Sequence, residues 1–309
     1  MTPPSPSQAT GVPGGLVLVD KPSGPTSHDC VAQARRLAAT KKVGHAGTLD
    51  PMATGLLVLG LGRATRLLTY LVGLDKAYSA TIRLGAATTT DDADGQVTFS
   101  SPAAMLPVRD VEAAMRTWRG RVEQVPSAVS AVKVGGRRAY ARVRAGEAVA
   151  LPPRLVQINR FDLTGTRVEG EFLDLNVLVE CSSGTYVRAL ARDLGAGLGV
   201  GGHLTALRRL SVGPFSVNQA QPLPSPPADL AILPMAEAAG RLWPVRPLSA
   251  DEARRLSHGQ PIAPPAPAAG GRGPGNGIGP VAAIRPDGEL VALLGPDAEG
   301  LWRPLVVFA

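Results

Sequence analysis

The sequence predicts an α+β fold: a mixed, largely antiparallel central sheet with flanking helices, followed by a small C-terminal β-rich module. Segments with a strand pattern outnumber helical ones, and the helices lie between groups of strands. Strict alternation of strand and helix would instead have indicated a doubly wound parallel sheet. From about Pro247 the pattern changes to short strands around a Pro/Gly-rich stretch. The 309 residues, 44% hydrophobic and 18% charged, are enough for one large globular domain and a small one.

The N-terminal part is expected to start with a disordered tail over residues 1–14, which are rich in Pro and Ser. Gly15–Asp20 has the pattern of a short buried strand. Ser27 is expected to cap a helix that runs to about Ala38. The elements expected next are a loop at 42–55, an apolar strand at 56–61 and a helix at about 63–71.

The middle of the chain begins with the clearest strand, Lys76–Leu84, whose alternation points Tyr78 inward. The polar loop 88–95 lacks the ligand pattern of a calcium site. Strands are expected at 96–99, 154–163, 172–180 and 201–210, and an extended stretch at 121–134. Helices are expected at 108–119, around Tyr140, and after the Gly turn that precedes Arg188.

The C-terminal part follows a Pro-rich connection at 221–229. A helix is expected at Ser249–Ser257, and a flexible Pro/Gly-rich insert at 263–280. Three short strands are then expected at 281–284, 290–294 and 301–308.

The composition narrows the functional classes. The formal charge of +7 favours a polyanionic partner, although it would also serve solubility alone. Cys30 and Cys181 have no metal-ligand spacing, so we expect no disulfide and a reducing cytoplasm. The first residues lack the pattern of a signal peptide, and the apolar run Leu56–Leu61 is too short for a membrane span. No P-loop, Ser/His/Asp motif or Cys/His metal motif is present, so no metal site is predicted.

The loop 42–55 carries the strongest candidate for chemistry. Asp50 is its only acid, and no other acid occurs between Asp29 and Asp75. An acid before proline commonly hydrogen-bonds its own turn, and that reading stays open from the loop alone. A single acid with an Arg or Tyr partner suits nucleophilic or acid–base catalysis, whereas a glycosidase normally needs two carboxylates.

Six blocks, in order, resemble the bacterial tRNA pseudouridine synthases of the TruB type. The blocks are Val19–Ser27, Gly44–Leu57, Lys76–Ala80, Thr90–Gly95, Gly184–Arg188 and His203–Leu210. The resemblance covers about residues 15–215, and the C-terminal module resembles a PUA RNA-binding domain. It implies a pseudouridine synthase catalytic domain over 15–240 and a PUA-like domain over 245–309. It also implies the family's activity, isomerisation of uridine 55 in the T loop of tRNA, a reaction that needs no cofactor.

By this resemblance Asp50 is the nucleophile, which attacks the nucleotide so that uracil detaches, rotates and rejoins through C5. Attack on the sugar, attack on the base and elimination all remain open. Arg188 would pair with Asp50 and keep it ionised. Tyr78 would stack on the uracil, Tyr186 would line the pocket and Leu207 would close it. From the residues alone, these side chains would have been assigned to the core or the surface.

The resemblance also assigns residues around the pocket. The target base must be extruded from its loop, and His45 would fill the space that it leaves. Asp92 would lie near the substrate, and Lys21 would support the active-site loop. Four basic residues are candidates for RNA phosphate contacts: Lys41, Lys42, Arg208 and Arg209.

The chain departs from the family pattern where Ser127 and Val129 replace a proline and an aromatic residue, which puts the local packing in question. The expected partner is the tRNA T stem-loop, with no membrane and no obligatory protein partner. The alternative function is a tRNA-binding folding chaperone in which catalysis is incidental.

Overall fold

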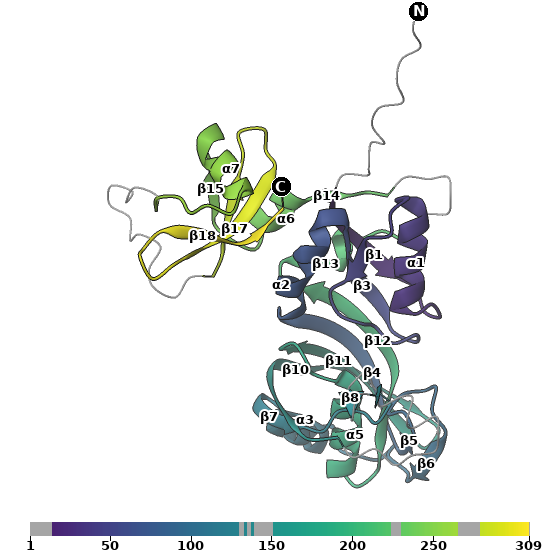
Figure 1. The fold of residues 1–309 in the computed structure, drawn as a ribbon. Coiled ribbons are helices and arrows are strands. Elements are labelled where there is room, and N and C mark those ends of the chain that lie inside the picture. The colour runs from purple at the N-terminus through teal and green to yellow at the C-terminus, as the bar shows by residue number, and fades with distance from the viewer. Residues whose placement is uncertain are drawn as a thin grey trace, which may run out of the picture.

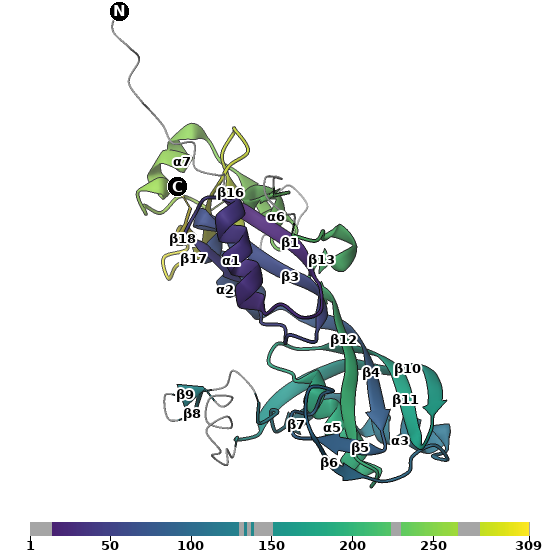
Figure 2. The same cartoon turned by 90° about the vertical axis from the view of Figure 1, so that its right-hand side faces the viewer.

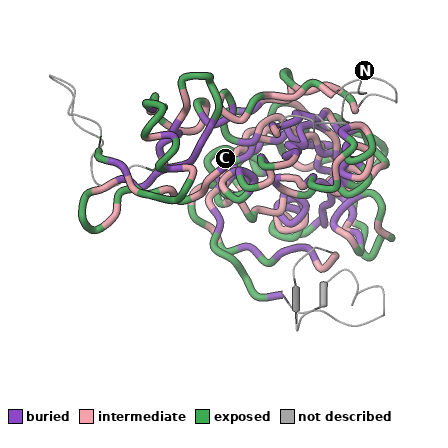
Figure 3. The backbone as a smooth tube through the Cα atoms, turned by 45° about the horizontal axis from the view of Figure 1, so that its top comes forward, coloured by how far each residue is buried: buried purple, intermediate pink, exposed green. Residues whose placement is uncertain are grey.

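The computed structural model describes residues 14–129, 133–134, 137–138, 151–223, 230–264 and 279–308. The expected tail at 1–13, the helix around Tyr140 and most of the 263–280 insert lie outside these residues. Figure 1 shows a larger body built on one long sheet and a smaller body built on a second sheet. Buried residues gather inside the larger body (Figure 3).

The large sheet has ten strands among the described residues, in the order β14-β1-β3-β12-β4-β11-β10-β7, with β13 on β12 and β2 on β3. Their bounds are β1 Gly15–Lys21, β2 Val43–His45, β3 Thr54–Leu61, β4 Lys76–Leu84, β7 Gly120–Gln124, β10 Arg154–Glu169, β11 Phe172–Cys181, β12 Gly202–Val212, β13 Phe215–Ser216 and β14 Leu233–Pro234. The pairs are antiparallel except that β12 runs parallel to β3, with Arg208 opposite Thr54 and Arg209 opposite Gly55. The predicted mixed, largely antiparallel sheet is confirmed.

Strand β3 explains the continuous apolar run in the sequence. Leu57, Leu59 and Leu61 belong to one core cluster, while Leu56 and Val58 belong to a second cluster on the opposite face. A strand covered on both faces has no solvent side and therefore shows no polar alternation.

Helices cover both faces of the large sheet. The first cluster includes side chains of α1 (Ser27–Leu37), α3 (Val108–Thr117) and α5 (Val187–Gly197). The second includes side chains of α2 (Leu68–Val72) and α6 (Met235–Gly240). Figure 2 shows α1 lying along β1 and β3. The helix expected at 63–71 is split into a 3-10 turn, η1 (Gly62–Arg66), and α2.

The start of α1 corrects the sequence prediction by one residue. Thr26, not Ser27, is the N-cap: its hydroxyl accepts from the Asp29 N–H, and the Asp29 carboxylate accepts from the Thr26 N–H. This reciprocal capping box leaves the Ser27 hydroxyl available for another contact. That contact is made in the functional site.

A small hairpin, β5 (Ala86–Thr88) and β6 (Val97–Ser100), lies beside α5 and carries the polar loop between its strands. The two-residue strands β8 (Lys133–Val134) and β9 (Arg137–Arg138) form a separate pair.

The smaller body is a four-stranded sheet in the order β15-β16-β17-β18 with the helix α7 (Ala250–Ser257). Its strands are β15 Val245–Pro247, β16 Val281–Ile284, β17 Leu290–Pro296 and β18 Trp302–Val307. Ala282, Leu290, Leu293 and Phe308 join the second core cluster of the larger body, so apolar packing connects the two. Within the part of the chain that is described, no helix is long and apolar enough to cross a membrane.

Candidate active site

The loop between β2 and β3 presents Asp50 to a pocket of about 260 Å³. Four segments contribute to the walls: this loop, strand β4, strand β12 and the turn that opens α5. The pocket is lined by six of the residues predicted from the sequence, namely Asp50, Tyr78, Tyr186, Arg188, Leu207 and Arg209.

Two buried side chains hold the loop on either side of Asp50. The Ser27 hydroxyl accepts from the Leu49 N–H at 2.8 Å and donates to the Leu49 carbonyl at 3.1 Å. The fully buried Lys21 donates to the carbonyls of Pro22 at 2.8 Å and Pro51 at 3.2 Å. Lys21 thus contacts the loop that it was expected to support. The role of Ser27 was missed because its position suggested only a helix cap.

Arg209 corrects the sequence prediction of a phosphate contact. Its side chain is 1% exposed, and its guanidinium donates to the carbonyls of Leu56 at 2.7 Å and Gly47 at 3.0 Å. A guanidinium held in this way cannot reach a phosphate on the surface of an RNA. Arg209 instead holds the loop that carries Asp50, through hydrogen bonds to its backbone.

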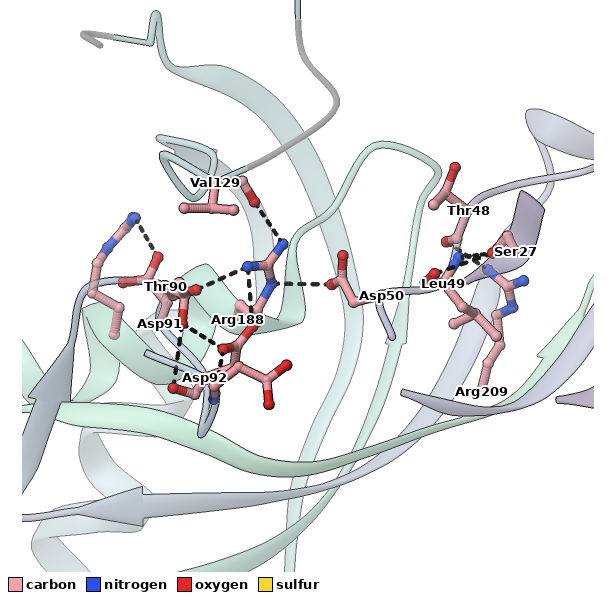
Figure 4. A network of polar contacts seen from close by, with 12 residues as sticks. Ser27, Thr48, Leu49, Asp50, Thr90, Asp91, Asp92, Val129, Arg188 and Arg209 are labelled. Atoms are coloured by element: carbon pink, nitrogen blue, oxygen red, sulfur yellow. Dashed lines mark hydrogen bonds and ion pairs between the residues drawn. The ribbon is translucent and has the colours of Figure 1, made fainter. Parts of the chain in front are cut away.

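Arg188 lies at the centre of the polar network (Figure 4). Its Nε is 3.1 Å from Asp50 Oδ2, and its Nη1 is 3.1 Å from Asp92 Oδ2. It also donates to the carbonyls of Thr90 at 2.8 Å and Val129 at 2.9 Å. One guanidinium thus joins the acid loop, the β5–β6 loop and the segment after β7.

Opposing effects act on the ionisation of Asp50. Burial raises the pKa of its carboxyl above the ordinary value of 3.8; Arg188 opposes this, and the negative charge of Asp92 adds to it. The Arg188 contact thus favours the ionised form, as expected, although the net direction of the pKa is upward. The Asp50 side chain is 37% exposed and faces the pocket, whereas Arg188 is 5% exposed.

The aromatic and apolar walls come from separate elements. Tyr78 on β4 is 7% exposed and Leu207 on β12 is 8% exposed. Burial raises the pKa of the Tyr78 phenol, which favours its neutral form. Tyr186 precedes α5, and its peptide is held by Gln124, which donates to its carbonyl at 3.1 Å and accepts from its N–H at 2.8 Å. Gln124 was not singled out from the sequence, where nothing marks a glutamine at the end of a strand.

Lys76 is a further pocket residue that the sequence did not single out. It is 8% exposed, and its ammonium donates to the carbonyls of Val72 at 2.9 Å and Leu74 at 2.6 Å. Burial, with Arg209 nearby, lowers the pKa of Lys76 to about 8.

His45 and Asp92 lie next to the pocket and do not line it. The His45 ring contacts the ring of His28 edge to face at 5.7 Å, and its buried Nδ1 has no partner among the described residues. Burial is the main cause that lowers the pKa of His45, which favours the neutral ring. Asp92, 4% exposed, lies behind Arg188 and accepts from the Thr90 hydroxyl and the Asp94 N–H.

The other predicted phosphate contacts differ in whether a carboxylate compensates their positive charge. Lys41 and Lys42 are exposed, and no carboxylate within the described segments forms an ion pair with them. Arg208 forms a two-pronged ion pair with Asp20 at 2.9 and 2.7 Å, so its charge is already largely compensated.

The departures from the family pattern leave the Arg188 contact intact. Val129 binds Arg188 through its backbone carbonyl, which does not depend on the side chain. Ser127 is fully buried, and its hydroxyl has no partner among the described residues. Those residues also contain no group of three or more His, Cys, Asp or Glu that could hold a metal ion.

Comparison with known folds agrees with this architecture. An H/ACA RNP bound to a substrate RNA containing 2'-deoxyuridine includes a chain that aligns with a TM-score of 0.67 at 25% identity, over 96% of this chain and 85% of that one. A Cbf5–Nop10–Gar1 complex gives a TM-score of 0.67 at 26% identity with the same coverage.

Family models account for most of the chain. Residues 35–187 match the TruB family pseudouridylate synthase N-terminal domain, residues 188–223 the tRNA pseudouridylate synthase B C-terminal domain, and residues 243–309 the tRNA pseudouridine synthase II C-terminal model. The chain and its fold are therefore those of a pseudouridine synthase.

Two relatives narrow the class to a family. The tRNA pseudouridine synthase B of Arthrobacter sp. (strain FB24) is 57% identical over 297 residues, which cover 96% of each chain. That of Thermobifida fusca (strain YX) is 53% identical over 299 residues, 96% of this chain and 98% of the relative. The chain belongs to the TruB family of pseudouridylate synthases.

Proposed function

We propose that this protein isomerises uridine 55 in the T loop of tRNA to pseudouridine, with Asp50 as the nucleophile. The observation that carries the proposal is the Asp50 carboxylate, open to a pocket and 3.1 Å from the Arg188 guanidinium. The names of the relatives, tRNA pseudouridine synthase B, support tRNA as the substrate.

The reaction needs no redox step and no added atom. The bond from uracil N1 to the ribose C1′ breaks, the base rotates, and a bond from C5 to C1′ forms. The proton on C5 is lost and N1 gains one, so the product is an isomer of the substrate. Asp50 takes part through attack on the sugar, attack on the base or elimination, and each route requires its carboxylate form.

The walls suit a base held away from water. Tyr78 offers an aromatic face on which uracil stacks, a contact worth about 1–3 kcal/mol per base. Tyr186 and the largely buried Leu207 also line the pocket. Exclusion of water matters because a detached base would otherwise be lost to hydrolysis.

The surroundings support extrusion and docking of the RNA. Unstacking the target uridine costs a few kcal/mol, and His45, which is favoured as a neutral ring, would occupy the space left in the T loop. The exposed Lys41 and Lys42 would contact RNA phosphates. A chaperone acting without chemistry is less well supported, because it would need no buried guanidinium paired with an acid that is open to a pocket.

Asp50→Asn is expected to abolish pseudouridine formation while changing the Kd for RNA by no more than a few-fold. A T stem-loop RNA would be incubated with enzyme and a chelator but no cofactor, then digested for nucleoside analysis. The matched control is Asp110→Asn, at an exposed acid on α3. Pseudouridine made by Asp50→Asn would refute the nucleophile assignment, and none made by the unaltered protein would refute the function.

A further inference from the structure

Helix α5 carries a second arginine, Arg192, one turn beyond Arg188. Residues four apart on a helix lie on the same face, one above the other. Arg192 Nη1 is 3.2 Å from Asp91 Oδ2, and its Nη2 donates to the Val125 carbonyl at 2.8 Å. It also pairs with the adjacent Asp193 at 2.8 Å.

The two arginines make the same pair of contacts at two levels. Arg188 binds Asp92 and the carbonyl of Val129; Arg192 binds Asp91 and the carbonyl of Val125. We call Arg188–Asp92 the inner pair and Arg192–Asp91 the outer pair. The side chains of the inner pair are each 5% exposed, whereas those of the outer pair are 27% and 12% exposed.

We propose that the outer pair positions the inner pair, and that Arg192 is therefore a positioning residue for the reaction assigned to Asp50. This inference rests on the proposed function. Three of the four partners of Arg188 within the described residues, namely Thr90, Asp92 and Val129, belong to the β5–β6 loop and to the segment after β7. Arg192 ties both of these segments to α5 from the next turn.

The backbone conformation at Asp91 allows both arginines to find a carboxylate. Asp91 has a φ of 61°, in the left-handed region that residues other than glycine rarely adopt. Its carbonyl accepts from the Leu204 N–H at 3.0 Å, which fixes the loop to β12. With the backbone held there, the adjacent Asp91 and Asp92 carboxylates each meet an arginine of α5.

Loss of the outer pair is therefore expected to make the position of the Arg188 guanidinium relative to Asp50 less well defined. The charged groups that face Asp50 are Arg188 from α5, Lys21 from β1, and Asp92 and Asp94 from the β5–β6 loop. A displaced Arg188 would oppose the effect of burial less, so the pKa of Asp50 would rise. Misplacement by about 1 Å at a reacting centre can slow a reaction about 100-fold.

The test compares Arg192→Gln and Asp91→Asn with the unaltered protein. Asn tolerates the left-handed backbone at position 91, so this variant removes charge without new strain. Both variants are expected to slow single-turnover pseudouridine formation at pH 7 about 10- to 100-fold, with the Kd for RNA changed by less than three-fold.

The pKa of Asp50, measured by carboxyl ¹³C NMR, separates positioning from a direct charge effect. Positioning raises the pKa in both variants. A direct field would raise it in Arg192→Gln, which loses a positive charge, and lower it in Asp91→Asn, which loses a negative one. Shifts of opposite sign, or rates within two-fold of the unaltered protein, would overturn the inference.

The control is Arg83→Gln, which breaks another ion pair, with Asp174 on the neighbouring strand β11, at matching exposure (22% and 5%). It is expected to lower the melting temperature without moving the Asp50 pKa. If Arg192→Gln fails to fold, Arg192→Lys replaces it. Lysine keeps the positive charge but holds Asp91 and the Val125 carbonyl less well than arginine does. An unchanged Asp50 pKa in Arg192→Lys would refute the inference. Because the pKa is read without substrate, it decides the positioning role even if the unaltered protein makes no pseudouridine.

Discussion

At the scale of single residues, the basic side chains around the pocket show what the sequence could and could not predict. Arg208 and Arg209 were grouped as phosphate contacts because they are adjacent and basic, yet only Arg208 reaches the surface. The alternation of side chains along β12 would have predicted the burial of Arg209, because Arg209 lies on the same face of the strand as the buried Leu207. The positive charge of Arg209 suggested a surface position, which the alternation contradicts.

The same scale gives a prediction for Lys76. Its pKa of about 8, against 10.5 in an open chain, implies that the folded protein releases this proton well before the unfolded chain does. Between these two pH values the unfolded state binds more protons, so the contribution of Lys76 to stability rises with pH. Below pH 8 the full cost of burying the ammonium is present.

We therefore expect a lysine ¹⁵N resonance that titrates near pH 8 and disappears in Lys76→Met. Denaturant unfolding from pH 7.5 to 10 should show the unaltered protein gaining stability relative to Lys76→Met, by up to about 3 kcal/mol. A parallel pH dependence of the two proteins would contradict the lowered pKa.

At the scale of elements, long and strongly patterned segments were predicted well. Strands β1, β3, β4, β11 and β12 and helices α3 and α7 lie within two residues of the predicted bounds, whereas β10, expected over 154–163, continues to Glu169. The two- and three-residue strands β14 and β15 were not predicted, because so few residues carry no period. The cap of α1 was misplaced by one residue because serine is the more favoured cap residue, so the sequence points to Ser27 rather than Thr26.

Helix α5, which carries both arginines, packs against the start of β12 through Gly195. A Cβ at this position would lie 2.2 Å from the backbone of Gly201 and Gly202. Gly195→Ala should therefore force the helix away from the sheet and cost about 1–3 kcal/mol of unfolding free energy.

The matched control is Gly197→Ala in the same helix, where a Cβ meets nothing within 4 Å. It should be neutral or stabilising by about 0.4–1 kcal/mol, because it restricts the unfolded chain. Equal thermal unfolding of the two variants would show that the close approach of α5 to β12 does not limit stability.

At the scale of the whole molecule, the exposed basic residues predict a steep dependence of RNA binding on salt. The logarithm of the observed binding constant falls linearly with the logarithm of the salt concentration, and the steepness of this fall grows with the number of phosphate contacts. Each lost contact reduces the slope by about one in log units. The Lys41→Gln/Lys42→Gln double variant should lower the slope, whereas Arg208→Gln should change it less because Asp20 compensates that charge. Filter binding between 50 and 300 mM salt measures this, and equal slopes would rule out Lys41 and Lys42 as phosphate contacts.

The shared core between the two bodies gives a second prediction at this scale. Leu293 of β17 is fully buried in the cluster that includes Leu56 and Val58 of β3. Leu293→Ala should cost about 2–5 kcal/mol, and Leu305→Ala, at a position 56% exposed, should cost little. Calorimetry of both variants measures the difference, and an unchanged melting temperature in Leu293→Ala would contradict the shared core.

The junction of β3 with β12 has a mechanical consequence. The two strands pair in register at only two positions, and at Gly55, where φ is 94°, a Cβ would lie 2.3 Å from the Arg209 carbonyl. Asp50 is attached to one side of this line, while Arg188 and Tyr78 are attached to the other. Bending at this line would change the gap between the acid and the guanidinium. The Arg209 side chain crosses the line from β12 to the carbonyls of Leu56 and Gly47 and so resists such bending.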